Sequence, residues 1–203
     1  MNDSTLLFDF IRRSPSPWHA VKTAAEALEK AGYARLEERE SWTLTPGGKY
    51  YTTREGSSLI AWRQPAAPAA GWRIAAAHSD SPAYRVKGAA VKSGCTMLLT
   101  EGYGGMIRAS WLDRPLGLAG RVLVRTAAGV EARLIAPDRD LAVMPHPAIH
   151  LDRGLNDGHK YDPKADMQAL FAPGDKTADY EALLAAEAGC AVEDILGAAI
   201  LLY

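Results

Sequence analysis

The last nine residues, Ile195–Tyr203 (ILGAAILLY), indicate the fold class most directly. They contain no charged side chain and no proline. Strands that are buried on both faces have continuous apolar runs of this kind, as in the middle of an α/β sheet. We therefore expect a core strand here and an α/β fold. Because chain ends are usually polar and exposed, we also expect that this sequence is cut short.

The residues before this run predict a helix and a β-rich region. Residues 177–188 are rich in Ala, Glu and Leu, and Gly189 follows them as at a helix C-terminus. Residues 117–125 and 130–136 predict a hairpin around residues 126–129 (TAAG). Strand-like segments and glycines are frequent from about residue 84 to about residue 160. We therefore expect a β-rich segment inserted into the α/β fold.

The N-terminal part of the chain predicts helices followed by strands. Residues 4–13 have the spacing of an amphipathic helix. Ser16 before Pro17 is a typical helix start, and Gly32 is a natural stop. The strand-like segments that follow are residues 49–54, 57–63 and 72–77.

The composition excludes several classes of function. The chain has 203 residues, of which 48% are hydrophobic and 23% charged, with a net charge of −1. Because no basic stripe exists, nucleic acid is not an expected partner. The longest apolar run is far too short to cross a membrane, and the N-terminus is not a signal peptide. The two cysteines, Cys95 and Cys190, have neither metal-ligand nor disulfide spacing, so we expect a cytoplasmic protein.

Residues 75–82 (AAAHSDSP) contain the sharpest candidate site. An apolar strand would bring His78 to its C-terminal end, where α/β folds place active sites. Asp80 is close enough to accept a hydrogen bond from one imidazole nitrogen, which would orient the ring as a metal ligand. An isolated His-x-Asp triplet also fits a local structural role, in which Asp80 caps a turn. On these residues alone both interpretations stay open.

The other histidines give weaker signals. His146 and His150 are four residues apart, but Pro147 argues against the helix that would bring them onto one ion. In an extended segment they would stand too far apart to share a small ion. A metal pair is therefore not expected, and each fits a structural or substrate-contacting role. We expect His19 and His159 to be ordinary surface or capping residues.

Several familiar catalytic motifs are absent from the sequence. It contains no HExxH zinc helix, no P-loop and no GxSxG elbow. Residues 101–105 (EGYGG) are glycine-rich but do not match the GxGxxG pattern, so they predict a tight turn or close backbone packing.

Taken together, the motifs resemble the aspartyl aminopeptidase family of cocatalytic zinc metallopeptidases. The matching segments, in the family's order, are residues 14–21 (SPSPWHAV), 49–51 (KYY), 77–82 (AHSDSP) with 85–87 (RVK), 103–105 (YGG), 110–114 (SWLDR) leading into 118–122 (LAGRV), and 145–153 (PHPAIHLDR). Each motif is weak by itself, but this number in one order is specific.

The resemblance implies an α/β catalytic domain that is interrupted by a β-rich dimerisation domain. It assigns residues 1–84 to the N-terminal part of the catalytic domain and residues 85–189 to the inserted domain. Residues 190–203 are assigned to a return into the catalytic domain. Similar enzymes form dimer-based homo-oligomers up to a dodecamer, so a homo-oligomer is expected here.

The resemblance also implies site residues and chemistry. His78 would be a zinc ligand, and Asp80 the carboxylate that orients its ring. His150 matches a histidine that similar enzymes extend into a neighbouring subunit's site to hold substrate or the tetrahedral intermediate. The expected reaction removes an acidic N-terminal residue, Asp or Glu, from peptide substrates, with two zinc ions (Zn2+) per complete subunit.

This sequence departs from the family in its supply of metal ligands. The family's remaining ligands lie downstream of the matched region and have no counterpart before Tyr203. One histidine cannot hold two zinc ions, because catalytic zinc typically takes about three protein ligands. Two other functions therefore stay open. One is a catalytically inactive assembly module that oligomerises with full-length subunits, and the other is a different zinc amidohydrolase or exopeptidase.

Overall fold

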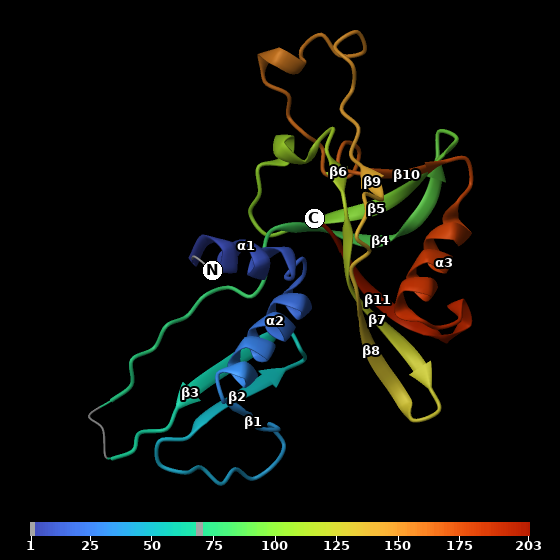
Figure 1. Ribbon diagram of the computed structural model, residues 1–203. Coiled ribbons are helices and arrows are strands. Elements are labelled where there is room, and N and C mark those ends of the chain that lie inside the picture. Colours follow the sequence, from blue (N-terminus) through green and yellow to red (C-terminus); the bar gives the residue numbers. More distant parts are fainter. Residues whose placement is uncertain (1–2, 68–70) are drawn as a thin grey trace. The chain divides into compact units, whose positions relative to one another are not determined.

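The computed structural model describes residues 3–67 and 71–203, and the chain divides into two compact units, Met1–Ser81 and Pro82–Tyr203 (Figure 1). The change in sequence character expected near residue 84 lies close to this division. Within the described ranges, no helix combines the length and apolar character that crossing a membrane requires.

The first unit consists of two helices and a small sheet (Figure 1). Its elements are α1 (Asp3–Arg12), α2 (Pro17–Lys30), β1 (Ala34–Arg35), β2 (Lys49–Arg54) and β3 (Ser58–Arg63). The strand order is β1-β2-β3, with β1 parallel and β3 antiparallel to β2. Both helices and the two longer strands lie within a few residues of the predicted positions.

The start of α2 follows from local sequence chemistry. Ser16 has an extended backbone, and its Oγ accepts a hydrogen bond from the backbone N–H of His19 at 3.4 Å. Pro17 occupies the first helical position, where a missing N–H costs nothing. After the helix, Gly32 adopts a left-handed φ of 82°, which favours glycine. The predicted cap and stop are therefore confirmed.

The predicted strand over residues 72–77 does not form. These residues have no regular secondary structure, and no strand in the described part of the chain pairs with them. Trp72 and Ile74 are exposed, Ile74 to 88%. Because a strand is stabilised by hydrogen bonds to a neighbour, apolar composition alone does not produce one here. His78 therefore follows an extended coil, not a sheet strand.

The second unit is built on an eight-stranded sheet in the order β6-β9-β10-β5-β4-β11-β7-β8. Its strands are β4 (Ala83–Lys92), β5 (Cys95–Tyr103), β6 (Pro115–Leu116), β7 (Leu118–Thr126), β8 (Gly129–Ile135), β9 (Ala142–Val143), β10 (Ala169–Pro173) and β11 (Ile195–Leu202). The other elements are α3 (Thr177–Ala188) and the 3-10 turns η1 (Arg108–Trp111), η2 (Leu155–Asp157) and η3 (Val192–Asp194). The predicted hairpin and helix correspond to β7–β8 and α3, and Gly189 ends α3 with a φ of 64°.

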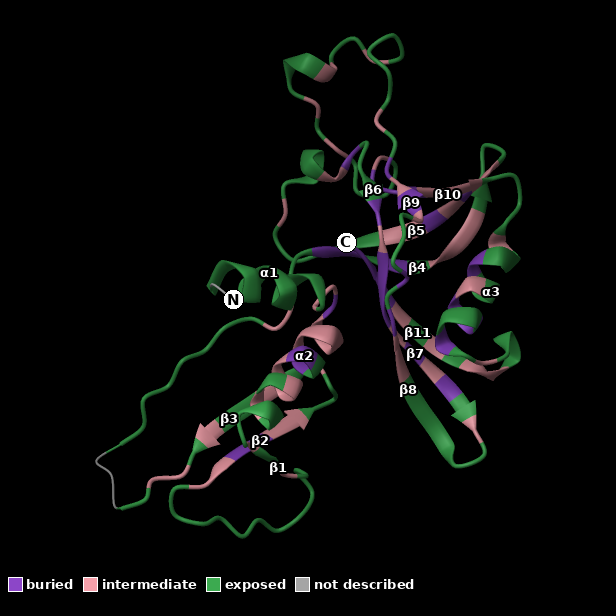
Figure 2. Ribbon diagram, viewed as in Figure 1, coloured by how far each residue is buried: buried purple, intermediate pink, exposed green. Residues whose placement is uncertain are grey.

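Strand β11 joins the two parts of this sheet. It pairs with β7 from Ile195 to Leu202, and with β4 only from Ile200 to Leu202. The structure places β11 in the second compact unit, and the assignment of residues 190–203 to a return into the catalytic domain stays a prediction. Burial on both faces also holds only for its last residues, since Leu196 is 45% exposed (Figure 2).

The core of the second unit lies between the sheet and α3. Tyr180, Leu184 and Ala188 of α3 are buried, and the helix packs against β4, β7 and β8 (Figure 1). The largest fully buried side chains of this unit are Tyr84, Leu98, Leu118, Met144, Met167, Ile200 and Leu202. Burial of each such side chain is worth about 1.5–3 kcal/mol, so the second unit has a substantial core of its own.

The close contact between the backbones of β7 and β11 predicts that Gly120 cannot be replaced without a loss of stability. A Cβ at Gly120 would lie 2.0 Å from the backbone oxygen of Ala199, whereas a Cβ at Gly197 would have no atom within 4 Å. Gly120→Ala should lower the free energy of unfolding by about 1–3 kcal/mol, because β11 must move. The matched control Gly197→Ala should change it by less than about 0.5 kcal/mol. Urea unfolding followed by circular dichroism measures both, and equal effects would contradict the account.

Candidate functional site

His78 and Asp80 are in contact, as the sequence predicted. The His78 Nδ1 lies 3.1 Å from Asp80 Oδ1, and the His78 side chain is 91% exposed. Between them, Ser79 donates a hydrogen bond from its Oγ to the backbone oxygen of Ser57 at 2.7 Å. This bond ties the coil to the turn that connects β2 and β3. With Nδ1 facing the carboxylate, Nε2 is left to bind a metal ion.

The metal chemistry of this chain is limited by its number of ligands. Among residues 3–67 and 71–203, no group of three or more His, Cys, Asp or Glu side chains converges as a metal site. The arrangement of His78 and Asp80 fits one zinc ligand with its orienting carboxylate. It does not fit a complete zinc site, which takes about three protein ligands for catalysis. No catalytic step can therefore be assigned to these residues alone.

His150 lies in the second unit, on a turn between β9 and β10. The backbone N–H groups of Leu151 and Asp152 both bond to the oxygen of Ala148, at 2.8 and 3.3 Å. His150 is exposed, and its ring makes no hydrogen bond within the part of the chain that the structure describes. The turn thus presents the imidazole to solvent, where it can contact another molecule.

His146 is held away from any pairing with His150. Its backbone N–H donates to Asp113 Oδ1 at 2.9 Å, and its Nε2 lies 3.5 Å from the Tyr161 hydroxyl. The segment that contains the two histidines is not helical, as Pro147 predicted. The structure therefore gives His146 a structural role and does not bring it together with His150.

Sequence reasoning missed the surroundings of His159. This residue was expected to be an ordinary surface or capping residue, but its ring lies between two carboxylates. Its Nδ1 is 3.3 Å from Asp152 Oδ2, and its Nε2 is 3.4 Å from Asp166 Oδ2. The two aspartates are each seven residues from His159 in the sequence, a symmetric spacing that could have drawn attention to it.

His19 is a half-buried structural histidine at the start of α2. Its Nδ1 lies 2.7 Å from Ser16 Oγ, the oxygen that also caps the helix. Burial, and then the charge of Lys22, lower the pKa of His19. An Nδ1 without a hydrogen can accept the Ser16 hydroxyl hydrogen, and this arrangement agrees with the lowered pKa of His19. This residue is part of the fold and not of a catalytic site.

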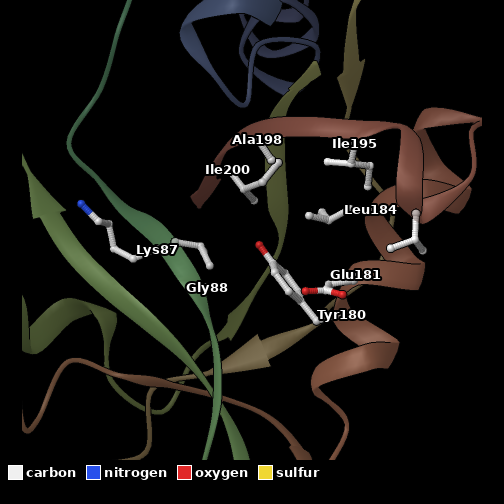
Figure 3. A pocket seen from close by; sticks show the side chains of 10 residues that line it. Lys87, Gly88, Tyr180, Glu181, Leu184, Ile195, Ala198 and Ile200 are labelled. Atoms are coloured by element: carbon white, nitrogen blue, oxygen red, sulfur yellow. The ribbon is translucent and has the colours of Figure 1, made fainter. Parts of the chain in front are cut away.

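The second unit also contains a cavity of about 310 Å³ beside α3. It opens where the pairing of β4 with β11 stops at Val86 and Ile200, and aliphatic side chains form most of its wall. Tyr180 projects into it from α3, whereas the Lys87 amino group points away (Figure 3) and bonds to Glu101 at 2.9 Å. Its lining contains no histidine or cysteine, and Glu181 is its only carboxylate, so it holds no thiol nucleophile and too few ligands for a zinc site.

Comparison with known proteins identifies the family. The family model described as "Aminopeptidase I zinc metalloprotease (M18)" matches residues 10–203. The chain belongs to the M18 family of aminopeptidases. The family predicted from the motifs is thereby confirmed.

The M18 relatives show how much of the family this chain represents. It is 43% identical over 187 residues to a "Probable M18 family aminopeptidase 2" of Pseudomonas putida (strain GB-1), covering 89% of this chain and 44% of that protein. Ape4, in a cryo-EM structure of its complex with Nbr1, matches with a TM-score of 0.91 and 31% identity over 96% of this chain and 42% of that one. Chaetomium thermophilum mApe1 matches with a TM-score of 0.87 and 30% identity over 98% of this chain and 50% of that one.

The M18 structures confirm the mixed α/β fold expected from the sequence. The chain spans about half the length of the solved relatives and 44% of the curated one. The matching family model describes a zinc metalloprotease family.

The lowered pKa of His19 predicts a loss of stability in acid. In the unfolded chain the imidazole binds a proton near pH 6.5, whereas the folded state resists protonation. The contribution of His19 is therefore fully present above the unfolded pKa and is lost as the pH falls through the folded pKa. His19→Gln should remove this part of the decrease in unfolding free energy between pH 7.5 and pH 5.5. An unchanged decrease, measured by urea unfolding at each pH, would show that His19 does not carry it.

Proposed function

We propose that this chain is part of an M18 zinc aminopeptidase, to which it contributes one metal ligand, His78. The observation that supports the proposal is the contact between His78 Nδ1 and Asp80 Oδ1 at 3.1 Å, in a chain whose family is described as zinc metalloprotease. In the bound state Asp80 would fix the tautomer and the orientation of the ring. The other ligands would come from protein outside these 203 residues.

The proposed reaction is the hydrolysis of the first peptide bond of a peptide. Zinc in the complete enzyme would supply Lewis-acid chemistry. The family resemblance implies two zinc ions per subunit. The residues of this chain would do two things: His78 with Asp80 would hold metal, and His150 would contact substrate in a neighbouring subunit. The exposed turn that carries His150 supports the second role.

We further propose a preference for an acidic N-terminal residue, which rests on the motif resemblance. A panel of Asp-, Glu-, Leu- and N-acetylated peptide substrates tests it on the longer protein that carries the remaining ligands. The proposal predicts fastest release of Asp or Glu. Preference for the acetylated peptides would indicate a zinc amidohydrolase of another class.

The assembly of the enzyme would depend on the second unit. We propose, from the family resemblance, that residues 85–189 are the oligomerisation module of a cytoplasmic homo-oligomer; they lie in a unit that has its own core and its own eight-stranded sheet. The two cysteines are both free, which suits a reducing compartment. The second candidate function, an inactive assembly module, is favoured because no group of three or more His, Cys, Asp or Glu side chains among the described residues could hold a metal ion. Reduced hydrolysis when this chain is mixed with a full-length M18 enzyme would support that function.

Replacing His78 should weaken zinc binding without unfolding the protein. In the longer protein, His78→Ala should abolish tight binding of one zinc ion and most of the activity, because the ring is a ligand. Asp80→Asn should weaken zinc binding by about 10–100-fold, since it loses the charge that orients the ring. Zinc content by mass spectrometry measures both effects. His146→Ala is the control histidine and should retain full zinc; full zinc in His78→Ala would exclude it as a ligand.

Removal of His150 should affect turnover and not metal. His150→Ala in the longer protein should lower kcat by roughly 10²–10³-fold, the usual cost of losing one donor to a tetrahedral intermediate. Zinc content should be unchanged. If this variant instead loses zinc, His150 is a metal ligand and the cross-subunit role is wrong.

A further inference from the structure

The connection between β9 and β10 is unusually long. It runs over residues 144–168, and its only helical element is the short 3-10 turn η2. Loops longer than about 12–15 residues without secondary structure are mostly either functional or disordered. This loop carries His150, so its order determines where that imidazole lies.

Both ends of this loop are fixed to the sheet unit. At the start, the backbone N–H of His146 bonds to Asp113 Oδ1 at 2.9 Å. At the end, Met167 is fully buried, and Gln168 Oε1 accepts a hydrogen bond from the backbone N–H of Thr100 at 2.9 Å. Thr100 also donates from its hydroxyl to the oxygen of Met167. Between these anchors, the loop needs contacts of its own.

His159 supplies the contact that joins the middle of the loop to its anchored end. Its Nε2 lies 3.4 Å from Asp166 Oδ2, one residue before buried Met167. Asp166 is itself held, since its Oδ2 accepts the backbone N–H of Asp162 at 2.7 Å. The ring of Tyr161 lies edge-on to the His159 ring, with centroids 4.8 Å apart. The contacts with Asp166 and Tyr161 thus hold the His159 ring near the buried end of the loop at Met167.

The other ring nitrogen of His159 reaches the turn that presents His150. Asp152 Oδ2 lies 3.3 Å from His159 Nδ1, and Asp152 Oδ1 accepts the backbone N–H of Gly154 at 3.0 Å. The backbone N–H of Asp152 closes the turn on Ala148. A continuous series of contacts therefore runs from the anchor at Met167 through His159 to the turn.

We propose that His159 is a positioning residue: its imidazole ties Asp152 to Asp166 and so holds the turn that presents His150. The catalytic part of this inference rests on the proposed role of His150. The physical part does not, because it concerns only the order of the loop. Partly exposed polar contacts of this kind are individually weak, so we expect the effect of losing them to be confined to the loop and to leave the sheet intact.

Hydrogen exchange measured by mass spectrometry on this chain tests the physical part. In His159→Ala, amide exchange over residues 147–158 should accelerate roughly three- to tenfold, while exchange in β4, β5, β7 and β11 stays unchanged. Asp152→Asn and Asp166→Asn should act in the same direction. His159→Gln, whose amide group has two N–H hydrogens, should restore part of the protection. Lys160→Ala is the neighbouring control: the Lys160 side chain makes no hydrogen bond or ion pair within the described residues, so its loss should leave the loop unaffected.

Two exchange results would overturn the proposal. One is unchanged exchange of residues 147–158 in His159→Ala. The other is faster exchange throughout the sheet, which would make His159 a general stability residue and not a positioning one.

Kinetics of the longer enzyme test the catalytic part. His159→Ala should lower kcat less than His150→Ala does, and it should add no further loss when combined with His150→Ala. A looser loop with unchanged kcat would overturn the positioning role. If His150→Ala itself leaves kcat unchanged, the proposed catalytic role of His150 is wrong, and so is the catalytic part of the His159 proposal. The exchange measurement would still decide whether His159 orders the loop, because it does not depend on kcat.

Discussion

The pairing of β11 with both β7 and β4 is the interaction on which the second unit depends. Without β11, the sheet would separate into β6-β9-β10-β5-β4 and the hairpin β7-β8, since no other strand connects them in the described fold. β11 can pair closely with β7 because Gly120 has no side chain; a Cβ at that position would collide with the backbone of Ala199. The same sheet then fixes β5 and Gln168, which anchor one end of the loop that carries His150. The loop is thus anchored within the five-stranded part of the sheet, which β11 joins to the β7–β8 hairpin.

Much of the fold could be predicted from local sequence chemistry. Ser16, Pro17 and Gly189 mark helix ends through rules that involve only a few neighbouring residues, and the β7–β8 hairpin follows from its turn. The failures concern long-range pairing. Residues 72–77 are apolar enough for a strand but have no strand beside them in the described chain. The apolar character of β11 predicted a core strand correctly, but it could not show that β4 and β7 are the strands beside it.

The candidate site could be predicted only where its residues are close in the sequence. His78 and Asp80 are two residues apart, so their contact needed no knowledge of the fold. His150 was found by resemblance, and the structure adds that its turn is exposed. The two contacts of His159 span seven residues on each side and depend on the path of an irregular loop. No periodicity describes such a path, which explains why this residue was first assigned to the surface.

The central claim is that this chain contributes one zinc ligand, His78, to an M18 metal site that it does not complete. The most direct test is a zinc titration of the 203-residue chain, followed by NMR of the five histidine rings. The account predicts weak binding, with the first and largest change at His78 Nε2 and little response from His146, His150 or His159. Tight stoichiometric binding, or a first response at any of those other histidines, would contradict it.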